Sequence, residues 1–451
     1  MTTKKSLIAL VFLLLTIAAK QAVVTDYLNL PDTVYNYAIT LPAYFTTNAG
    51  GGGPPTSIAG LDNTPANNPM TNNGATLGRV LFYDKNLSIN RTIACASCHV
   101  QANGFSDSRT LSVGFAGGTT RRHAMTIIDS KYYQRGRFFW DERAATLETQ
   151  VLIPMQDATE MGLTSAQISQ RVSGQTYYNQ LFINAFGDNT ITNDRVSKAL
   201  AQFIRSIESY QSKYDIGRGQ VATPGATFPN FTAQENQGKN LFFQPIGNGG
   251  GGCVGCHTTE AFVNANPGPE NNGIDAVSTT DLGAGETFPQ NLNLRGRFKT
   301  TTLRNIELTA PYMHDGRFAT LEQVVEHYNS GIQNHPTLSN ALKTANGTPV
   351  RLNFSITQKA AMVAFLKTFT DNSVATEARW SNPFVPCVGN VSLSGAVSSG
   401  TYQSSNSVNL QNGANQSSSN VNIGAGNVIT MSPPFEVKSV NYFKAQIGGC
   451  N

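Results

Sequence analysis

Charge is scarce in this sequence. Only 13% of its 451 residues are Asp, Glu, Lys or Arg, and the formal net charge is +4. No basic tract of the kind that binds nucleic acid occurs, so we expect no nucleic-acid partner. Hydrophobic residues nevertheless make up 40% of the chain, which is enough to build large buried cores. Length and composition together predict a globular protein of two or three domains.

Long apolar runs are missing beyond the N-terminus. The chain starts with Lys4 and Lys5, followed by an apolar run over residues 7–17 and then by Ala18 and Ala19. This order indicates a secretory signal peptide over residues 1–19. The run is too short to span a bilayer comfortably, which argues against the alternative of a membrane anchor. We therefore expect export, to the periplasm in the first place or else to the cell surface or medium, and no integral membrane protein.

Cysteine occurs only six times. Four of the six lie in two C-x-x-C-H motifs, which contain Cys95, Cys98 and His99, and Cys253, Cys256 and His257. In such a motif both thiols can add to the vinyl groups of one porphyrin, and the histidine can ligate its iron. A zinc site would need four ligands, and a redox dithiol would not need the trailing histidine twice. The motifs predict two covalently bound haem c groups.

The other two cysteines, Cys387 and Cys450, lie far from any histidine. In an oxidising compartment they are expected to form a disulfide. Past residue 387 the chain is rich in Ser, Asn and Gly, with short alternating runs at 421–423 and 428–431. These runs predict a small all-β module over residues 387–451, and a disordered tail is the alternative.

Helical patterns dominate the region between a Gly- and Pro-rich loop at 46–75 and about residue 372. Helices are expected after Thr192, Thr232, Thr320 and Thr357, each followed by apolar residues on one face. A pattern G-[RK]-x-L-F-[YF] occurs at 78–83 and again at 238–243, ahead of each C-x-x-C-H motif. The repeat predicts two related haem domains, at 76–190 and 191–375, behind an N-terminal extension at 20–75. The fold class is therefore mostly α, with two cytochrome c-type haem domains and the β module.

Six segments together resemble the bacterial di-haem cytochrome c peroxidase family, which includes the methylamine-utilisation (MauG-like) enzymes. They read LGRVLFYD at 77–84, CASCH at 95–99, FWDERA at 139–144, EMG at 160–162, TLRN at 302–305 and TAPYMHDG at 309–316. The resemblance covers residues 76 to 372 and leaves out both ends of the chain. It implies that the first haem is the site of peroxide reduction and that the second haem transfers electrons.

The resemblance also implies roles for single residues. Gln150 and Glu160 fall where the family places the amide and carboxylate that line the peroxide pocket. A carboxylate there can move a proton between the two peroxide oxygens, and an amide can orient them. Trp140 matches the tryptophan between the haems, where an aromatic ring can relay electrons or simply pack as core. Arg304 is expected to pair with a haem propionate, unless it is a plain surface residue.

Two departures from the family pattern are informative. Residues 100–122 contain no histidine that could block the first haem, so we expect an open site there. His123 stands where the family has an Asn that helps to bind calcium, and imidazole is a poor calcium ligand. Whether calcium binds is therefore left open, and the backbone oxygens of Thr309 and Pro311 are the ligands that could hold it. Tyr328 stands where conventional members place a Met ligand of the second haem, as in the MauG-like branch. A buried packing role for Tyr328 and ligation by the neighbouring His327 are the alternatives.

These expectations converge on a peroxidase. Hydrogen peroxide is the expected substrate, and a small cytochrome c or copper protein is the expected electron donor. One alternative is a MauG-like oxidase that acts on a protein or a small molecule. A second is a plain electron-transfer cytochrome, which would need no acid–base pair beside an open iron. A third makes the C-terminal module an attachment or sorting unit for a haem-carrying cargo.

Overall fold

The protein was analysed as a computed structural model. It describes residues 26–47, 55–133, 135–264 and 268–386, and past that point only the strands given below. The chain divides into two compact units. One unit consists of residues 30–384, and the other of residues 1–29 with 385–451. The expected signal peptide at 1–19 lies outside the described residues, as do Cys387 and Cys450, so both of these predictions stay predictions.

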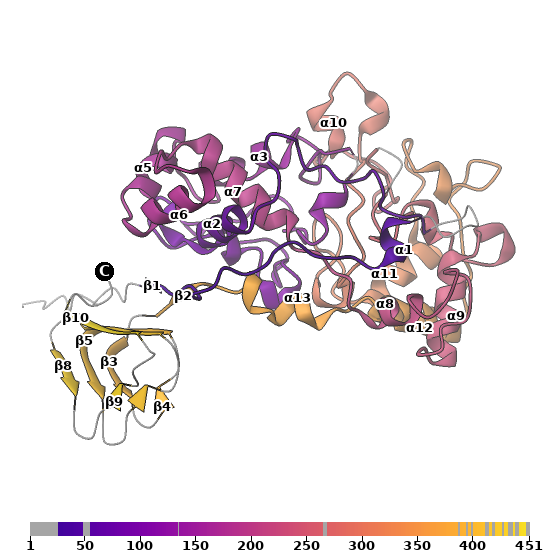
Figure 1. The fold of residues 1–451 in the computed structure, drawn as a ribbon. Helices are drawn as coiled ribbons and strands as arrows, with labels where there is room; N and C mark the ends of the chain where they lie inside the picture. The colour runs from indigo at the N-terminus through magenta and orange to yellow at the C-terminus, as the bar shows by residue number, and fades with distance from the viewer. Residues whose placement is uncertain are drawn as a thin grey trace, which may run out of the picture. The chain divides into compact units, whose positions relative to one another are not determined.

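The unit of residues 30–384 is mostly helical (Figure 1). Its α-helices are α1 (Ala43–Thr46), α2 (Asn72–Tyr83), α3 (Leu147–Gln150), α4 (Ile153–Gln156), α5 (Ser165–Ser173), α6 (Tyr177–Phe186), α7 (Asn193–Arg205), α8 (Lys213–Arg218), α9 (Ala233–Phe243), α10 (Ala284–Thr287), α11 (Leu321–Glu326), α12 (Ile356–Lys367) and α13 (Asn372–Thr376). The short strands β1 (Tyr27–Leu28) and β2 (Phe384–Val385) lie in sequence next to the two points where the chain passes between the units. Among the described residues, no helix is long and apolar enough to cross a membrane.

The expected helix starts are largely confirmed. The hydroxyl of Thr192 accepts a hydrogen bond from the N–H of Arg195 at the start of α7. Thr232 and Thr320 form capping boxes at the starts of α9 and α11. Two expectations are wrong. The cap of α12 is Ser355, so Thr357 lies in the first turn, and α2 already begins at residue 72, inside the segment expected to be a loop.

Two helix pairs organise the helical unit, and they are built in the same way. Helix α2 packs on α7, and α9 packs on α12, as Figure 1 shows for both pairs. A Cβ atom placed on Gly78 of α2 would lie 2.0 Å from the carbonyl oxygen of Ala199, and one on Gly238 of α9 would lie 1.9 Å from that of Ala361. Only glycine allows so close an approach of the two backbones. The repeated glycine of the sequence pattern therefore marks a repeated helix contact.

The aromatic core repeats as well. The rings of Phe82 and Phe203 lie 5.2 Å apart across the first helix pair, and those of Phe242 and Phe365 lie 5.3 Å apart across the second. All four side chains are buried. Each C-x-x-C-H motif follows the first helix of its pair by a short connection. The division of the chain into two haem domains at residue 190 stays a prediction.

The described residues past 385 form parallel strands in two sheets. The strands are β3 (Val388–Leu393), β4 (Ala396–Val397), β5 (Gly400–Leu410), β6 (Asn415–Gln416), β7 (Asn420–Ala425), β8 (Val428–Met431), β9 (Glu436–Val437) and β10 (Tyr442–Ile447). One sheet has the order β10-β7-β5-β3, with β8 also paired to β5, and the other has the order β4-β6-β9. The runs at 421–423 and 428–431 fall on β7 and β8. Because the segments between the strands are not described, an all-β module stays a prediction.

The register of these strands shows a repeat that the sequence reading missed. Gly400 of β5 pairs with Val421 of β7, and Asn415 of β6 pairs with Glu436 of β9, so the partners are 21 residues apart. Val421 in turn pairs with Phe443 of β10, 22 residues further on. Nearer the start of this region the spacing is shorter, 17 residues between Val391 and Val408 and 19 between Ala396 and Asn415. Parallel pairing of each strand with one about 17 to 22 residues further on is the pattern of a chain that stacks successive coils on one another.

Candidate functional site

The first C-x-x-C-H motif forms a tight turn with an oriented histidine. Cys95–Ser97 is a 3-10 turn, and Cys95 and Cys98 are free thiols. The Nδ1 atom of His99 lies 3.0 Å from the carbonyl oxygen of Phe105. A carbonyl can only accept, so Nδ1 must carry the proton, and Nε2 keeps the lone pair that can bind a metal. Phe105 has a left-handed backbone (φ 55°), which belongs to the turn that presents its carbonyl.

The second motif repeats this construction. Cys253–Gly255 is again a 3-10 turn, and Nδ1 of His257 lies 2.8 Å from the carbonyl oxygen of Phe262, whose φ is 52°. Burial lowers the pKa of His257 to about 4, so its imidazole is neutral and suited to binding a metal. The hydrogen bond on Nδ1 fixes the orientation of the ring, as partners of metal-ligating histidines usually do.

A cavity of about 480 Å³ lies beside the first motif. It is lined by Cys98, His99, Trp140, Gln150 and Glu160, among others, and we call it the first cavity. A smaller pocket of about 60 Å³ lies beside it and shares the lining residues Cys98, His99, Gln150 and Glu160. Cys95 lines this smaller pocket. The structure therefore brings together the two residues expected in the peroxide pocket with the histidine expected to hold the haem.

Gln150 and Glu160 reach this cavity from consecutive segments. Gln150 is the last residue of α3, and Glu160 lies in the turn that follows α4. Burial raises the pKa of Glu160 to about 7, and the neighbouring carboxylate of Asp157 adds to the shift, while Arg143 opposes it. A carboxyl group with a pKa near neutrality can both take up and release a proton. This is the property that a proton shuttle needs.

A second cavity, of about 230 Å³, lies beside the second motif. Its lining includes Cys253, Cys256, His257 and Tyr328, and we call it the second cavity. The second cavity is thus lined by both thiols and the imidazole of its motif. The first cavity is lined by Cys98 and His99, and Cys95 lines the small pocket beside it. This donor set fits covalently bound haem. Among the described residues, no group of three or more His, Cys, Asp or Glu side chains is placed to hold a metal ion directly, so the thiols lack the partners that tetrahedral zinc needs.

Trp140 lines both cavities. Its indole Nε1 donates a hydrogen bond to the carbonyl oxygen of His123 at 2.8 Å. The ring of His314 meets it edge to face at 6.4 Å between centroids, and the ring of Phe298 stacks on that of His314 at 3.7 Å. Trp140 therefore lies between the two cavities, in contact with a short series of aromatic rings.

Tyr328 lines the second cavity, whereas His327 does not. Both belong to a π-helical turn, His327–Gly331, that continues α11; such turns are frequent at functional sites. The Nε2 atom of His327 is engaged with the backbone oxygen of Asn272 at 3.0 Å. Burial raises the pKa of Tyr328 to about 12, and the side chain of Asn272 acts in the opposite direction. Of the two neighbours, Tyr328 alone faces the space where a second haem would bind.

His123 is buried among backbone oxygens. Its Nδ1 lies 3.2 Å from the carbonyl oxygen of Arg109, and its Nε2 lies 3.1 Å from the hydroxyl of Ser106. Because both nitrogens have partners in the protein, no further ligand is needed to satisfy the ring. Thr309 and Pro311 are the expected calcium ligands. Pro311 follows a cis Ala310–Pro311 peptide bond, and Thr309 comes directly before Ala310. Calcium binding through their backbone oxygens stays a prediction.

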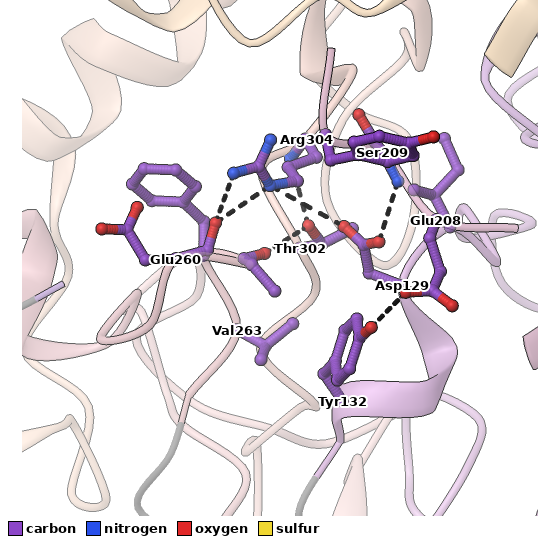
Figure 2. A network of polar contacts seen from close by, with 12 residues as sticks. Asp129, Tyr132, Glu208, Ser209, Glu260, Val263, Thr302 and Arg304 are labelled. Carbon is purple, nitrogen blue, oxygen red and sulfur yellow. Dashed lines mark hydrogen bonds and ion pairs between the residues drawn. The ribbon is translucent and has the colours of Figure 1, made fainter. Parts of the chain in front are cut away.

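Arg304 lies away from both cavities, in a buried polar network (Figure 2). Its Nη1 pairs with Asp215 at 2.8 Å, and its Nη2 donates to the carbonyl oxygen of Glu260 at 2.6 Å. Figure 2 shows its guanidinium between Glu260 and Asp129, whose Oδ2 is 4.0 Å from Nε. The positive charge is thus compensated by carboxylates of the protein. The expected pairing of Arg304 with a propionate has no support from this geometry.

Four cationic residues line the first cavity and were not expected there from the sequence: Arg121, Arg122, Arg143 and Lys299. Arg121 is paired with Glu286, and Arg122 is paired with Asp281. Arg143 lines the cavity and lies over the ring of Phe139, 3.6 Å from its centroid. Lys299 lines both cavities and is buried. Arg143 belongs to the FWDERA segment, so the family resemblance could have indicated it as a site residue. Lys299 lies in no quoted motif, and only the tertiary structure places it here.

Taken together, these features define the class. Two pairs of free thiols, each followed by an oriented histidine and each beside an internal cavity, are the sites of a di-haem c-type cytochrome.

The comparisons with known proteins identify the family. The model of the family "Di-haem cytochrome c peroxidase" matches residues 72–220. The chain is 33% identical to cytochrome c551 peroxidase of Nitrosomonas europaea over 68% of its own length and 81% of that protein. It is 32% identical to methylamine utilization protein MauG of Methylorubrum extorquens over 67% and 80%. The chain belongs to the di-haem cytochrome c peroxidase family, which includes the MauG proteins, and haem c is the cofactor of this family.

A solved structure agrees with this assignment. The crystal structure of a MauG-like protein associated with microbial copper homeostasis is 31% identical and has a TM-score of 0.62. The match covers 76% of this chain and 98% of that one. The family resemblance noted in the sequence is therefore confirmed, and the protein is an oxidoreductase of the cytochrome c peroxidase and MauG type.

Proposed function

We propose that this protein reduces hydrogen peroxide in the first cavity, with electrons that arrive through the second. The observation that carries the proposal is the meeting of Gln150 and Glu160 with His99 in one cavity. An electron carrier needs no acid–base residue beside its haem. A carboxyl group with a pKa of about 7 that lines the same cavity as His99 can serve the proton transfer of peroxide cleavage.

The chemistry of the carboxyl group follows from the reaction. Reduction of hydrogen peroxide breaks the O–O bond and consumes two electrons and two protons, giving two molecules of water. Glu160, as a carboxylate, takes the proton from one peroxide oxygen at a carboxylate oxygen and passes it to the departing oxygen. The amide of Gln150 can hold the substrate by hydrogen bonds while this happens. The two haems, when bound, supply the electrons.

Trp140 would relay electrons between haems held in the two cavities, because it lines both of them. Because the indole N–H is held by the carbonyl oxygen of His123, the plane of the ring is fixed. The expected donor to the second haem is a small cytochrome c or copper protein. Export to the periplasm, calcium between the haems and the Cys387–Cys450 disulfide belong to the same proposal.

A second function, favoured by one specific observation, is oxidation of a protein or small molecule in the manner of MauG. Tyr328 lines the second cavity in the position where conventional peroxidases use methionine. A tyrosine ligand stabilises oxidised iron more than a methionine ligand does. A second haem of this kind would accept electrons poorly. It would be oxidised more readily, and it could therefore share the oxidising equivalents of the first haem.

Replacement of Glu160 by glutamine tests the proposed function. Glu160→Gln keeps the size of the side chain but cannot shuttle the proton, so turnover of peroxide should fall by ~10²-fold or more while both haems stay bound. The control is Glu322→Gln, at an exposed position of α11. Steady-state peroxide consumption with a reduced donor is the measurement. Unchanged turnover in the Glu160→Gln protein would exclude Glu160 as the proton shuttle, and a wild-type protein that consumes no peroxide would favour an electron-transfer cytochrome.

A further inference from the structure

Lys299 stands on the boundary between the two cavities. It lines both of them, as Trp140 does, and its backbone N–H donates to the carbonyl oxygen of Trp140 at 2.9 Å. The residue is only 6% exposed. Its position is therefore tied to the segment that separates the two haem sites, and water cannot solvate its charge freely.

The ammonium group of Lys299 faces the first cavity. Nζ lies 3.4 Å from the ring centroid of Tyr133 and 4.4 Å from that of Phe138. Both rings line the first cavity, and neither lines the second. Among the residues that the structure describes, Nζ has one hydrogen-bond acceptor, the carbonyl oxygen of Arg137 at 2.5 Å. An ammonium group has three N–H donors, and the partners of the other two in this structure are the faces of the two rings, which bind a cation more weakly than a carboxylate does.

No carboxylate of the protein neutralises this charge. In the part of the chain that the structure describes, Lys299 forms no ion pair. Glu142 acts on it from a distance, but the Oε2 of Glu142 is already paired with Nε of Arg135 at 2.8 Å. A buried charge without a counter-ion is costly, and burial lowers the pKa of Lys299 to about 7. The faces of two aromatic rings recover part of that cost but do not replace an anion.

We propose that Lys299 is a haem-anchoring residue, whose ammonium group binds a propionate carboxylate of the haem in the first cavity and raises the reduction potential of that haem. A propionate is the anionic group that haem itself brings to the site. A fixed positive charge near an iron disfavours the extra positive charge of its oxidised state, and it does so most strongly where water is excluded. The proposal rests on the assignment of a haem to this cavity. Lys299 would thereby have the role in propionate binding that the sequence suggested for Arg304.

Reduction potentials of the complete holoprotein test the proposal. Lys299→Met keeps the length of the side chain and removes the charge. It should lower the potential of the first haem, identified as the haem whose spectrum changes on addition of cyanide, and shift the propionate bending mode in its resonance Raman spectrum. Lys299→Arg, which keeps the charge, should preserve most of the potential.

Lys239 supplies the matched control. It is 0% exposed, its Nζ donates to the carbonyl oxygen of Pro224 at 2.8 Å, and the ring of Phe228 lies 4.7 Å away. It lines neither cavity. Lys239→Met therefore removes an equally buried lysine and should leave both potentials and the Raman mode unchanged.

Two results would overturn the proposal. One is a Lys299→Met protein with an unchanged first potential and an unchanged propionate mode. The other is a Lys239→Met protein whose first potential falls as far as that of Lys299→Met. If Lys299→Met does not retain its haems, Lys299→Gln is measured in its place, and an unchanged potential there has the same meaning. No peroxide is added in these measurements, so a protein without peroxidase activity would still decide the role of Lys299.

Discussion

Glu160 gives the sharpest expectation for a single residue, because its pKa of about 7 lies within the range where enzymes are assayed. The group has to be ionised before it can accept the proton of the substrate. Turnover should therefore be highest above pH 7 and fall as the pH is lowered through about 7, where the carboxylate becomes protonated. Initial rates of peroxide consumption across this range are the measurement, and Glu160→Gln should lose the step. A wild-type rate that stays flat through the same range would argue against Glu160 as the shuttle.

Tyr328 gives a second expectation at the residue scale. If its oxygen binds the iron of the second haem, Tyr328→Phe should change the low-spin part of the resting spectrum and leave the first haem unaltered. Tyr312→Phe is the matched control, since Tyr312 lines the same cavity but its hydroxyl donates to the carbonyl oxygen of Ile306 at 3.1 Å. Electronic and electron paramagnetic resonance spectra provide the measurement. A Tyr328→Phe spectrum identical to that of the wild type would exclude Tyr328 as a ligand.

At the scale of elements, the contact of α9 with α12 depends on Gly238. Alanine would favour an isolated helix by up to about 1 kcal/mol. Here its Cβ would lie 1.9 Å from the backbone oxygen of Ala361, which cannot move without displacing the helix. The steric cost exceeds the helical gain, so Gly238→Ala should lower the free energy of unfolding by about 1–3 kcal/mol. Denaturant unfolding measures this, with Gly247→Ala as the control, since Gly247 has no atom within 4 Å of such a Cβ. Equal stability of the two variants would show that the contact of α9 with α12 does not depend on the glycine.

The elements also show how far the sequence could lead. The haem motifs are local, because thiols and imidazole must reach one macrocycle, and their turns follow directly from spacing. Helix caps are local as well, and three of the four expected starts were right. The role of Lys299 depends on rings and carbonyls from distant segments, so no pattern could reveal it. The same holds for Arg304, whose partners Asp215 and Glu260 come from other parts of the chain.

The C-terminal repeat was missed for a different reason. Strands are usually found through their hydrophobic alternation. In this region Ser and Asn occupy many positions, and the 21-residue spacing between β5 and β7 is carried by backbone pairing. A search for spacing instead of hydrophobicity could have found it, because a stacked coil repeats its length even where its residues vary.

At the scale of the whole molecule, the helical unit repeats one construction around its two C-x-x-C-H motifs, with different residues in the two cavities beside them. Both copies of this construction use a glycine contact, a pair of facing phenylalanines and a histidine held by a carbonyl of a left-handed residue. Among the described residues, Gln150 and Glu160 line the first cavity, and Tyr328 lines the second. A common construction with different lining residues explains how one chain could combine a reaction site with an electron-entry site.

Reduction of peroxide in the first cavity with electrons that enter through the second fixes the stoichiometry of donor oxidation. It is measured on the complete protein, with a reduced small cytochrome c or copper protein in excess and peroxide added in known amounts. Two electrons should leave the donor for each peroxide consumed, and Glu160→Gln should slow this reaction by ~10²-fold or more. Donor oxidation that does not depend on peroxide, or peroxide loss without donor oxidation, would contradict this mechanism.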